Sequence, residues 1–288
     1  MRMQTFRGPF VALTLSAVAL LAGCAMFSNK PPGSATAASP IAATASVTLA
    51  SAASASTTEP APPEATNNAP VVSFQPIVNL PAPPENLWAM LRKNFSLPDG
   101  NEHRVEVQLA WYRNHPGYMV RTATRAQPYL YYIVQQLKKR HMPLDLALLP
   151  VVESAYDPFA YSYGRAAGLW QFIPSTGRLY GLHQNWWYDG RRDIVGSTNA
   201  ALDYLQSLHD KFDSWLLALA AYNSGGGTVE AAIRYNKRHG RATDFWHLNL
   251  PLQTRNYVPR LLAVRDLILD SSKYGITLPT IPDSPYLA

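Results

Sequence analysis

One acidic residue stands out in the sequence because of its surroundings. Glu153 directly follows the apolar run LALLPVV and precedes Ser154. Apolar neighbours and the partial negative charge of a helix C-terminus both raise the pKa of a carboxyl group. A general acid that works near neutral pH needs such a raised pKa, so Glu153 is a candidate proton donor. The ordinary alternative is a structural glutamate that is hydrogen-bonded to the backbone or to an arginine.

Three downstream segments carry residue types that suit a sugar ligand. The segment GLWQF offers small residues for close backbone approach, two aromatic rings for stacking and the amide of Gln171. The pair Tyr222 and Asn223 closes an apolar helix before Gly225, a glycine cap. Tyr257 lies at the start of the last predicted helix. Each segment alone has a structural explanation, as a core aromatic residue or a helix cap.

In this order the segments resemble a known family. Glu153-Ser154, GLWQF, AYNSG and Tyr257 are similar to the motifs of the soluble-lytic-transglycosylase (SLT) type of peptidoglycan lyase. The stretches FIPSTGRLYGL, WWYDGRRDIVGSTNAALDYL and PLQTRNYVPRLLA resemble its membrane-bound lytic transglycosylase D branch. The resemblance covers residues 130–265, which is nearly the whole predicted folded domain. It implies an all-α, lysozyme-like fold of the goose-type lysozyme/SLT kind.

The resemblance also implies roles for individual residues. Glu153 corresponds to the single acid/base catalyst, and Tyr257 to a tyrosine close to that acid. Gln171 corresponds to a glutamine that contacts substrate near the scissile bond. The full set of implied substrate-binding residues is Ser154, Gly168, Leu169, Trp170, Gln171, Phe172, Tyr222, Asn223 and Tyr257.

A single acid suffices when the substrate supplies the nucleophile. Most glycosidases use two carboxylates, but Asp157 precedes Pro158 and is predicted to form a turn, and Asp189 and Asp193 an ion-paired loop. The expected reaction cleaves the bond between N-acetylmuramic acid and N-acetylglucosamine and leaves a 1,6-anhydromuramoyl end. It needs no cofactor and no metal, and the histidines show no HExxH spacing.

Two alternatives stay open at this point. A lysozyme-type muramidase would hydrolyse the same bond, and a second acid facing Glu153 would favour it. A non-catalytic peptidoglycan-binding lipoprotein is the other alternative. The chain has no LysM repeats, which relatives in this branch often carry, so retention on the polymer is expected to depend on the groove, the basic surface and a membrane anchor.

The N-terminal region predicts export and anchoring. Residues 1–23 have basic residues followed by an apolar stretch too short to span a membrane, as in a lipoprotein signal peptide. Cys24, the only cysteine, is the predicted lipidation site, and Ala25 after it favours the outer membrane, facing the periplasm. Residues 24–84, rich in Ala, Ser, Thr and Pro, are predicted to be a disordered tether. The net charge of +6 suits an anionic partner such as the cell wall, and the export signal argues against nucleic acid.

From residue 85 onward the composition predicts one all-α domain. Apolar residues recur at helical spacing, strand alternation is nearly absent, and the predicted domain runs to residue 275. Residues 276–288 are predicted to be an extended tail. The predicted helices and apolar stripes are 87–91, 107–112, 129–137, 144–153, 197–211, 214–223, 228–238 and 253–272.

Overall fold

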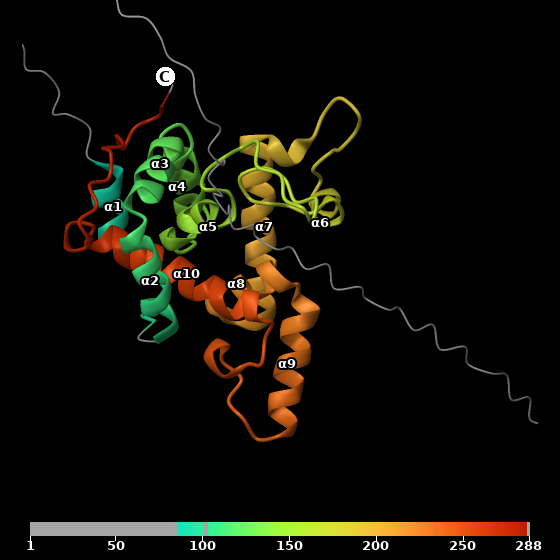
Figure 1. Ribbon diagram of the computed structural model, residues 1–288. Helices are drawn as coiled ribbons and strands as arrows, with labels where there is room; N and C mark the ends of the chain where they lie inside the picture. The colour runs from blue at the N-terminus through green and yellow to red at the C-terminus, as the bar shows by residue number, and fades with distance from the viewer. Residues whose placement is uncertain (1–85, 101–102, 287–288) are drawn as a thin grey trace, which may run out of the picture. The chain divides into compact units, whose positions relative to one another are not determined.

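The computed structural model describes residues 86–100 and 103–286, and helices joined by loops make up these ranges (Figure 1). The only β pairing within them consists of isolated bridges, which confirms the all-α prediction. The signal peptide, Cys24 and the predicted tether lie outside the described residues. In the two described ranges, no helix combines the length and hydropathy that crossing a bilayer requires.

The helices are named in chain order. The α-helices are α1 (Leu87–Asn94), α2 (His103–Asn114), α3 (Pro116–Ala126), α4 (Leu130–Lys139), α5 (Leu149–Ser154), α6 (Pro174–Leu179), α7 (Ile194–Phe212), α8 (Trp215–Ser224), α9 (Gly226–Arg238) and α10 (Leu252–Leu269). The 3-10 helices are η1 (Leu144–Leu148), η2 (Gly190–Arg192), η3 (Phe245–His247) and η4 (Ser272–Tyr274).

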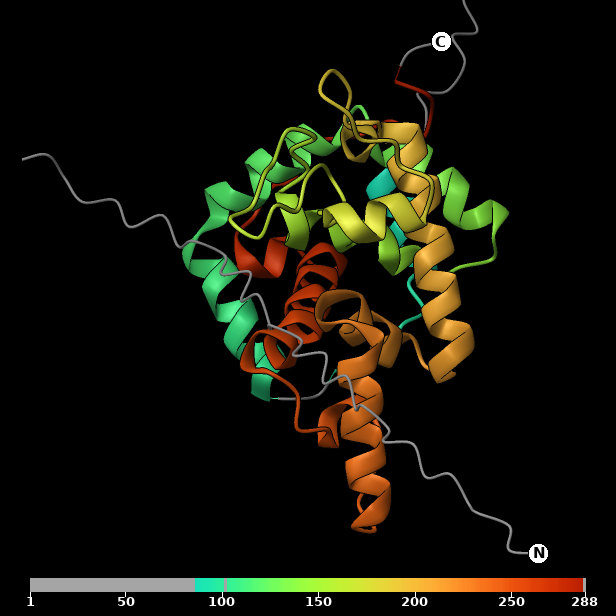
Figure 2. The same ribbon diagram turned by 90° about the vertical axis from the view of Figure 1, so that its right-hand side faces the viewer.

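Helix α10 organises the core. It packs most extensively against α2 and also contacts α8, α5 and α1. In Figures 1 and 2 it runs through the middle of the helices, while α7 and α8 form a second packed pair. Its side chains Val258, Leu261 and Leu262 are fully buried, so one helix links the N-terminal helices to the C-terminal half of the domain.

Helix α2 shows where the predicted apolar stripe is wrong. Val107 was expected on the buried face, but 51% of its surface is exposed. The buried residues are Val105, Leu109 and Tyr112, whose spacing of four and three follows the helical period. Apolar residues lie on several sides of this helix, so only the position of α10 selects the buried face.

The later helices agree with the predicted ranges, with small shifts at their ends. Helix α7 begins before residue 197 because the carboxylate of Asp193 accepts a hydrogen bond from the Gly196 amide at 2.6 Å and caps the helix. Helix α8 ends at Ser224 and is followed by Gly225, whose φ of 85° agrees with the predicted glycine cap. Helix α9 begins at Gly226 rather than at 228, and α10 ends before 272.

The C-terminal segment, described up to residue 286, packs on the core. Ile276 and Ile281 are buried. The Leu87 amide donates to the Ile281 carbonyl at 2.7 Å, and the Trp88 indole donates to the Pro279 carbonyl at 2.9 Å. The tail therefore covers α1.

Candidate active site

The chain changes helix type just before Glu153. The sequence predicts one helix over 144–153 interrupted by Pro150, whereas the structure has a 3-10 helix, η1, followed by α5 with Pro150 in its first turn. A proline is tolerated there because the first amides of a helix lack partners. Ala155 and Tyr156 then take left-handed φ values of 52° and 57° and end the helix. Glu153 thus lies in the last turn of α5, as predicted.

Glu153 as a whole residue is half-buried. Burial of its carboxyl group is the main reason that its pKa is raised from 4.5 to a net value of about 7. Two groups oppose this rise: the Tyr257 hydroxyl donates a hydrogen bond to the carboxyl oxygen Oε1, and the nearby charge of Arg260 lowers the pKa. The balance leaves a carboxyl group that both gives and takes a proton near neutral pH.

The GLWQF segment meets the end of α5 through its backbone. The Ser154 hydroxyl donates to the Leu169 carbonyl at 2.9 Å, and the Tyr222 hydroxyl donates to the Trp170 carbonyl at 2.8 Å. The structure therefore brings the GLWQF segment beside Glu153 and Tyr222. Both hydroxyl protons are used in this packing, so these groups face any ligand mainly as acceptors.

The two rings of GLWQF do not form the predicted stacking face. Trp170 is fully buried and its indole donates to the Thr198 hydroxyl at 3.0 Å, while Phe172 is 3% exposed. An indole that is enclosed and hydrogen-bonded in the core cannot stack on a sugar. The side chain of Leu169 is also fully buried, so this segment contributes its backbone and Gln171.

Gln171 has the strained backbone in this segment. Its φ is 49°, and its side-chain amide donates to the Gly168 carbonyl at 2.9 Å and to the Ala160 carbonyl at 3.3 Å. Left-handed φ values at residues other than glycine cost energy and often mark functional positions. The amide oxygen is the part of Gln171 left for a ligand.

Gly168 is required by the approach of a second loop. Its φ is 82°, and a Cβ atom built there would lie 1.9 Å from the Arg191 carbonyl oxygen. The buried guanidinium of Arg191 donates to the carbonyls of Arg165 at 2.6 Å and Phe172 at 3.0 Å, and pairs with Asp189 at 2.7 Å. The predicted ion-paired loop is therefore present at Asp189. The expectation for Asp193 is wrong, since it caps α7 instead.

Asn223 and Tyr222 face different neighbours. The Asn223 side-chain oxygen accepts from the Thr254 hydroxyl at 2.9 Å, which links α8 to α10. Tyr222 packs against Phe172 and Tyr204, with ring centroids 6.3 Å and 5.3 Å apart. Burial, followed by the nearby Glu153 charge, raises the pKa of Tyr222 well above its usual value, so it stays protonated.

Sequence reasoning missed Arg260 and its neighbour Gln108. Arg260 lies one turn after Tyr257 on α10, and its Nε donates to the Gln108 side chain on α2 at 3.4 Å. Its spacing of three from Tyr257 was a usable signal, because residues three apart share a helix face. Gln108 had no such signal, since only the packing of α2 on α10 brings it near.

The remaining acidic residues are placed elsewhere. Asp157 accepts from the Phe159 amide at 2.9 Å, which makes the predicted turn. In the described part of the chain, no group of three His, Cys, Asp or Glu side chains is arranged to hold a metal ion.

The fold and the site together define an all-α protein in which one glutamate at a helix end meets a tyrosine, a serine and a glycine-containing loop. Residues 131–245 match the family described as Transglycosylase SLT domain. These residues are therefore similar to an SLT-type transglycosylase domain.

Relatives of known name are similar to parts of this chain. Over 208 residues the chain is 49% identical to the membrane-bound lytic murein transglycosylase D of Escherichia coli K12, covering 72% of this chain and 46% of that protein. Over 121 residues it is 33% identical to the membrane-bound lytic murein transglycosylase C of Glaesserella parasuis, covering 36% and 33%. The chain spans about half the length of the first of these relatives. A crystal structure of the 70 kDa soluble lytic transglycosylase from Escherichia coli aligns at TM-score 0.40 and 18% identity, covering 65% and 32%.

Proposed function

We propose that this chain is a peptidoglycan lytic transglycosylase that uses Glu153 as its only acid/base catalyst. The observation that carries the proposal is the half-buried Glu153, whose pKa is raised to about 7 and which accepts a hydrogen bond from Tyr257. The substrate is the bond between N-acetylmuramic acid and N-acetylglucosamine, in line with the murein named in the relatives' descriptions.

In the first step, protonated Glu153 gives its proton to the glycosidic oxygen. The bond from that oxygen to the muramoyl C1 breaks, and N-acetylglucosamine leaves as the alcohol. The 2-acetamido group of the muramoyl residue stabilises the positive charge at C1. A second carboxylate is therefore not needed, unlike in most glycosidases.

In the second step, ionised Glu153 takes the proton of the muramoyl C6 hydroxyl as that oxygen bonds to C1. The product is a 1,6-anhydromuramoyl end, Glu153 is protonated again, and no water is consumed. The Tyr257 hydroxyl and the Arg260 charge stabilise the carboxylate between the two steps, since both lower the pKa of Glu153.

The surrounding residues would hold the sugars on either side of the acid. Gln171 offers its amide oxygen, and the backbone from Gly168 to Phe172 forms one wall of the site. Tyr222 and Asn223 lie beside this wall, where the Tyr222 hydroxyl donates to the Trp170 carbonyl. Ser154 fixes that backbone relative to Glu153 through its bond to Leu169. Trp170 and Phe172 support these walls from inside the core.

Product analysis tests the proposal. The protein is incubated with purified peptidoglycan, and mass spectrometry then separates anhydromuramoyl from reducing muramoyl ends. We expect anhydro ends from the natural sequence and none from Glu153→Gln. The matched control is Glu230→Gln on α9, which removes a surface carboxylate paired with Lys211 and should keep activity.

Two results would contradict the proposal. Reducing ends without anhydro ends would identify a lysozyme-type muramidase. Binding to peptidoglycan without any cleavage would identify a non-catalytic wall-binding lipoprotein.

We also propose that the domain is held at the cell envelope. The predicted arrangement is a signal peptide over 1–23, a lipidated Cys24, a tether to residue 84, a catalytic domain over 85–275 and a tail from 276. The description of two relatives as membrane-bound supports an envelope location. Cell fractionation tests the anchor: Cys24→Ser should move the protein from the outer membrane to the soluble periplasmic fraction, and unchanged membrane association would contradict it.

A further inference from the structure

The guanidinium of Arg260 is half-buried and has no negatively charged group paired with it among the described residues. Its one hydrogen bond to a named side chain, to Gln108, is long at 3.4 Å and goes to a neutral acceptor. The ion pairs of the described residues do not include it, so it lies near Glu153 without forming a salt bridge to that residue. Guanidinium groups removed from water normally bind an anion, because burial of an unpaired charge is costly.

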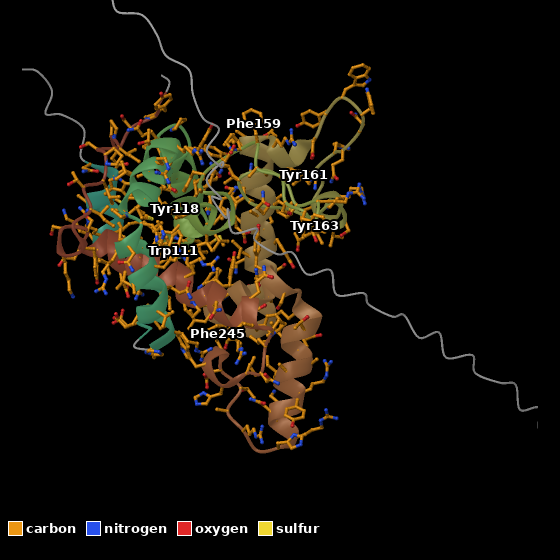
Figure 3. All side chains as sticks on the ribbon, in the orientation of Figure 1. Trp111, Tyr118, Phe159, Tyr161, Tyr163 and Phe245 are labelled. Atoms are coloured by element: carbon orange, nitrogen blue, oxygen red, sulfur yellow. The ribbon has the colours of Figure 1, made fainter. Side chains whose placement is uncertain are left out.

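Helix α2 provides a wall beside this charge. Gln108 and Trp111 are three residues apart and share a face of the helix, and 42% of the Trp111 surface is exposed. The Trp111 ring packs on His115 and Tyr118, with centroids 4.3 Å and 5.3 Å apart. Figure 3 shows Trp111 and Tyr118 close together where α2 and α3 approach α10.

This wall is fixed relative to helix α5, which carries Glu153. The Tyr118 hydroxyl donates to the Val151 carbonyl at 3.0 Å, and Val151 precedes Glu153 by two residues in α5. On the other side, Arg260 follows Tyr257, which donates to Glu153. The Arg260 guanidinium is thus bonded to Gln108, and the exposed Trp111 ring lies one turn farther along the same face of α2.

We propose that Arg260, together with Gln108 and Trp111, binds a carboxylate of the acidic peptide carried by the muramoyl residue. The inference rests on the proposed function and names its preferred substrate: peptide-bearing rather than bare glycan. The peptide is joined to the same sugar whose C1 reacts, so its carboxylates lie near the acid. A guanidinium binds a carboxylate through two parallel hydrogen bonds. Residues 108, 111 and 260 lie outside the segment 131–245 that matches the family.

A binding measurement on an inactive background tests this inference. Glu153→Gln protein is titrated with soluble peptide-bearing glycan strands and with the same strands after an amidase has removed the peptides. We expect tighter binding of the peptide-bearing strands, by about tenfold, as for one charge-assisted contact. Adding Arg260→Gln should abolish this preference, and Arg260→Lys should retain part of it because the charge remains.

The control variant removes a guanidinium group from another helix. Arg238→Gln, in the last turn of α9, should leave the preference unchanged. Equal affinity of the Glu153→Gln protein for both strand types would overturn the inference. So would an equal loss for both types with Arg260→Gln, which would mean that Arg260 contributes to binding of the glycan and not of the peptide. Because binding is measured without turnover, this result is independent of the product analysis that tests the proposed function.

Discussion

The pKa of Glu153 is set by opposing effects of its surroundings, and the proposed acid/base role depends on their balance. Burial raises its pKa, while the Tyr257 hydroxyl and the Arg260 charge lower it, so the value stays at about 7. Without burial the group would be ionised and unable to donate a proton. Without Tyr257 and Arg260 its pKa would rise further, and it would be a weaker acid in the first step. A single residue can serve both steps because neither influence dominates.

Tyr257→Phe tests this balance through the pH dependence of activity. The hydroxyl stabilises ionised Glu153, so its removal raises the pKa of Glu153 further. Deprotonation of the acid causes the alkaline decline of kcat/KM, and we expect that decline to move to higher pH by roughly 0.5–1 unit. The control Tyr286→Phe, on a tyrosine that is 60% exposed, should not move it. A shift to lower pH would contradict the assignment.

The raised pKa of Glu153 also has a consequence for stability. The folded-state pKa of about 7 exceeds the unfolded value of 4.5, so the folded protein retains a proton that the unfolded chain releases. Stability from this group is complete below pH 4.5 and is lost as the pH rises through 7. Glu153→Gln should therefore stabilise the protein at pH 8, by up to about 3 kcal/mol, and have little effect near pH 4.

Urea denaturation at the two pH values measures this difference. The Glu230→Gln protein serves as a contrast of opposite sign, because the hydrogen bond from Lys211 lowers the pKa of that carboxyl group, so its loss should not stabilise the protein at pH 8. A stability gain that is the same at both pH values would show that the effect does not come from ionisation of Glu153.

At the scale of elements, two loops hold the end of α5. The loop containing Gly168 is joined to α5 by the hydrogen bond from Ser154 to Leu169. The loop before α7 is joined to the Gly168 loop by the hydrogen bond from Arg191 to Phe172. Since Arg191 also bonds to the Arg165 carbonyl, one buried guanidinium fixes both ends of the segment that forms the wall of the site. The wall thus depends on contacts made away from any substrate.

Gly168→Ala tests this coupling. The added Cβ would meet the Arg191 carbonyl oxygen at 1.9 Å in a backbone with φ of 82°, so the two loops must separate. We expect a loss of roughly 2–4 kcal/mol in the free energy of unfolding, together with loss of activity in the protein that remains folded. The control Gly227→Ala lies in α9 with open space around it and should be neutral or slightly stabilising. Thermal denaturation and peptidoglycan digestion provide the two measurements, and a fully active, stable Gly168→Ala protein would contradict the prediction.

The sequence predicts those parts of the site that depend on local order. Glu153 at a helix end and Asn223 before a glycine cap follow from neighbours a few residues away. Burial of Trp170 does not, because its partner Thr198 lies on a helix farther along the chain. Arg260 beside Gln108 is a contact across 152 residues. Such contacts depend on how α2 packs on α10, which the helical period of each helix alone does not determine.

At the scale of the whole described domain, the first helix and the last segment close on each other. Asn86 pairs with Pro282 in an isolated bridge, and the Arg92 side chain donates to the Ile268 carbonyl at the end of α10. Helix α10 carries both Tyr257 and Arg260, so its position sets the electrostatics of Glu153. Contacts that hold the end of α10 in place therefore support the site at a distance.

Ile281→Ala separates stability from chemistry in this region. Ile281 is 1% exposed and its carbonyl anchors Leu87, so truncation leaves a cavity beneath the tail while the backbone bond remains. We expect a loss of roughly 2–4 kcal/mol and a fall in Tm of roughly 5–10 °C for a domain of this size. Calorimetry measures the fall in Tm. The control is Tyr286→Ala, at a residue that is exposed. Activity per folded molecule at low temperature should be unchanged, because Ile281 belongs to the tail that is bonded to α1 and not to the segments that carry the site residues. A selective loss of activity at unchanged Tm would instead show that the tail acts on the site through α10.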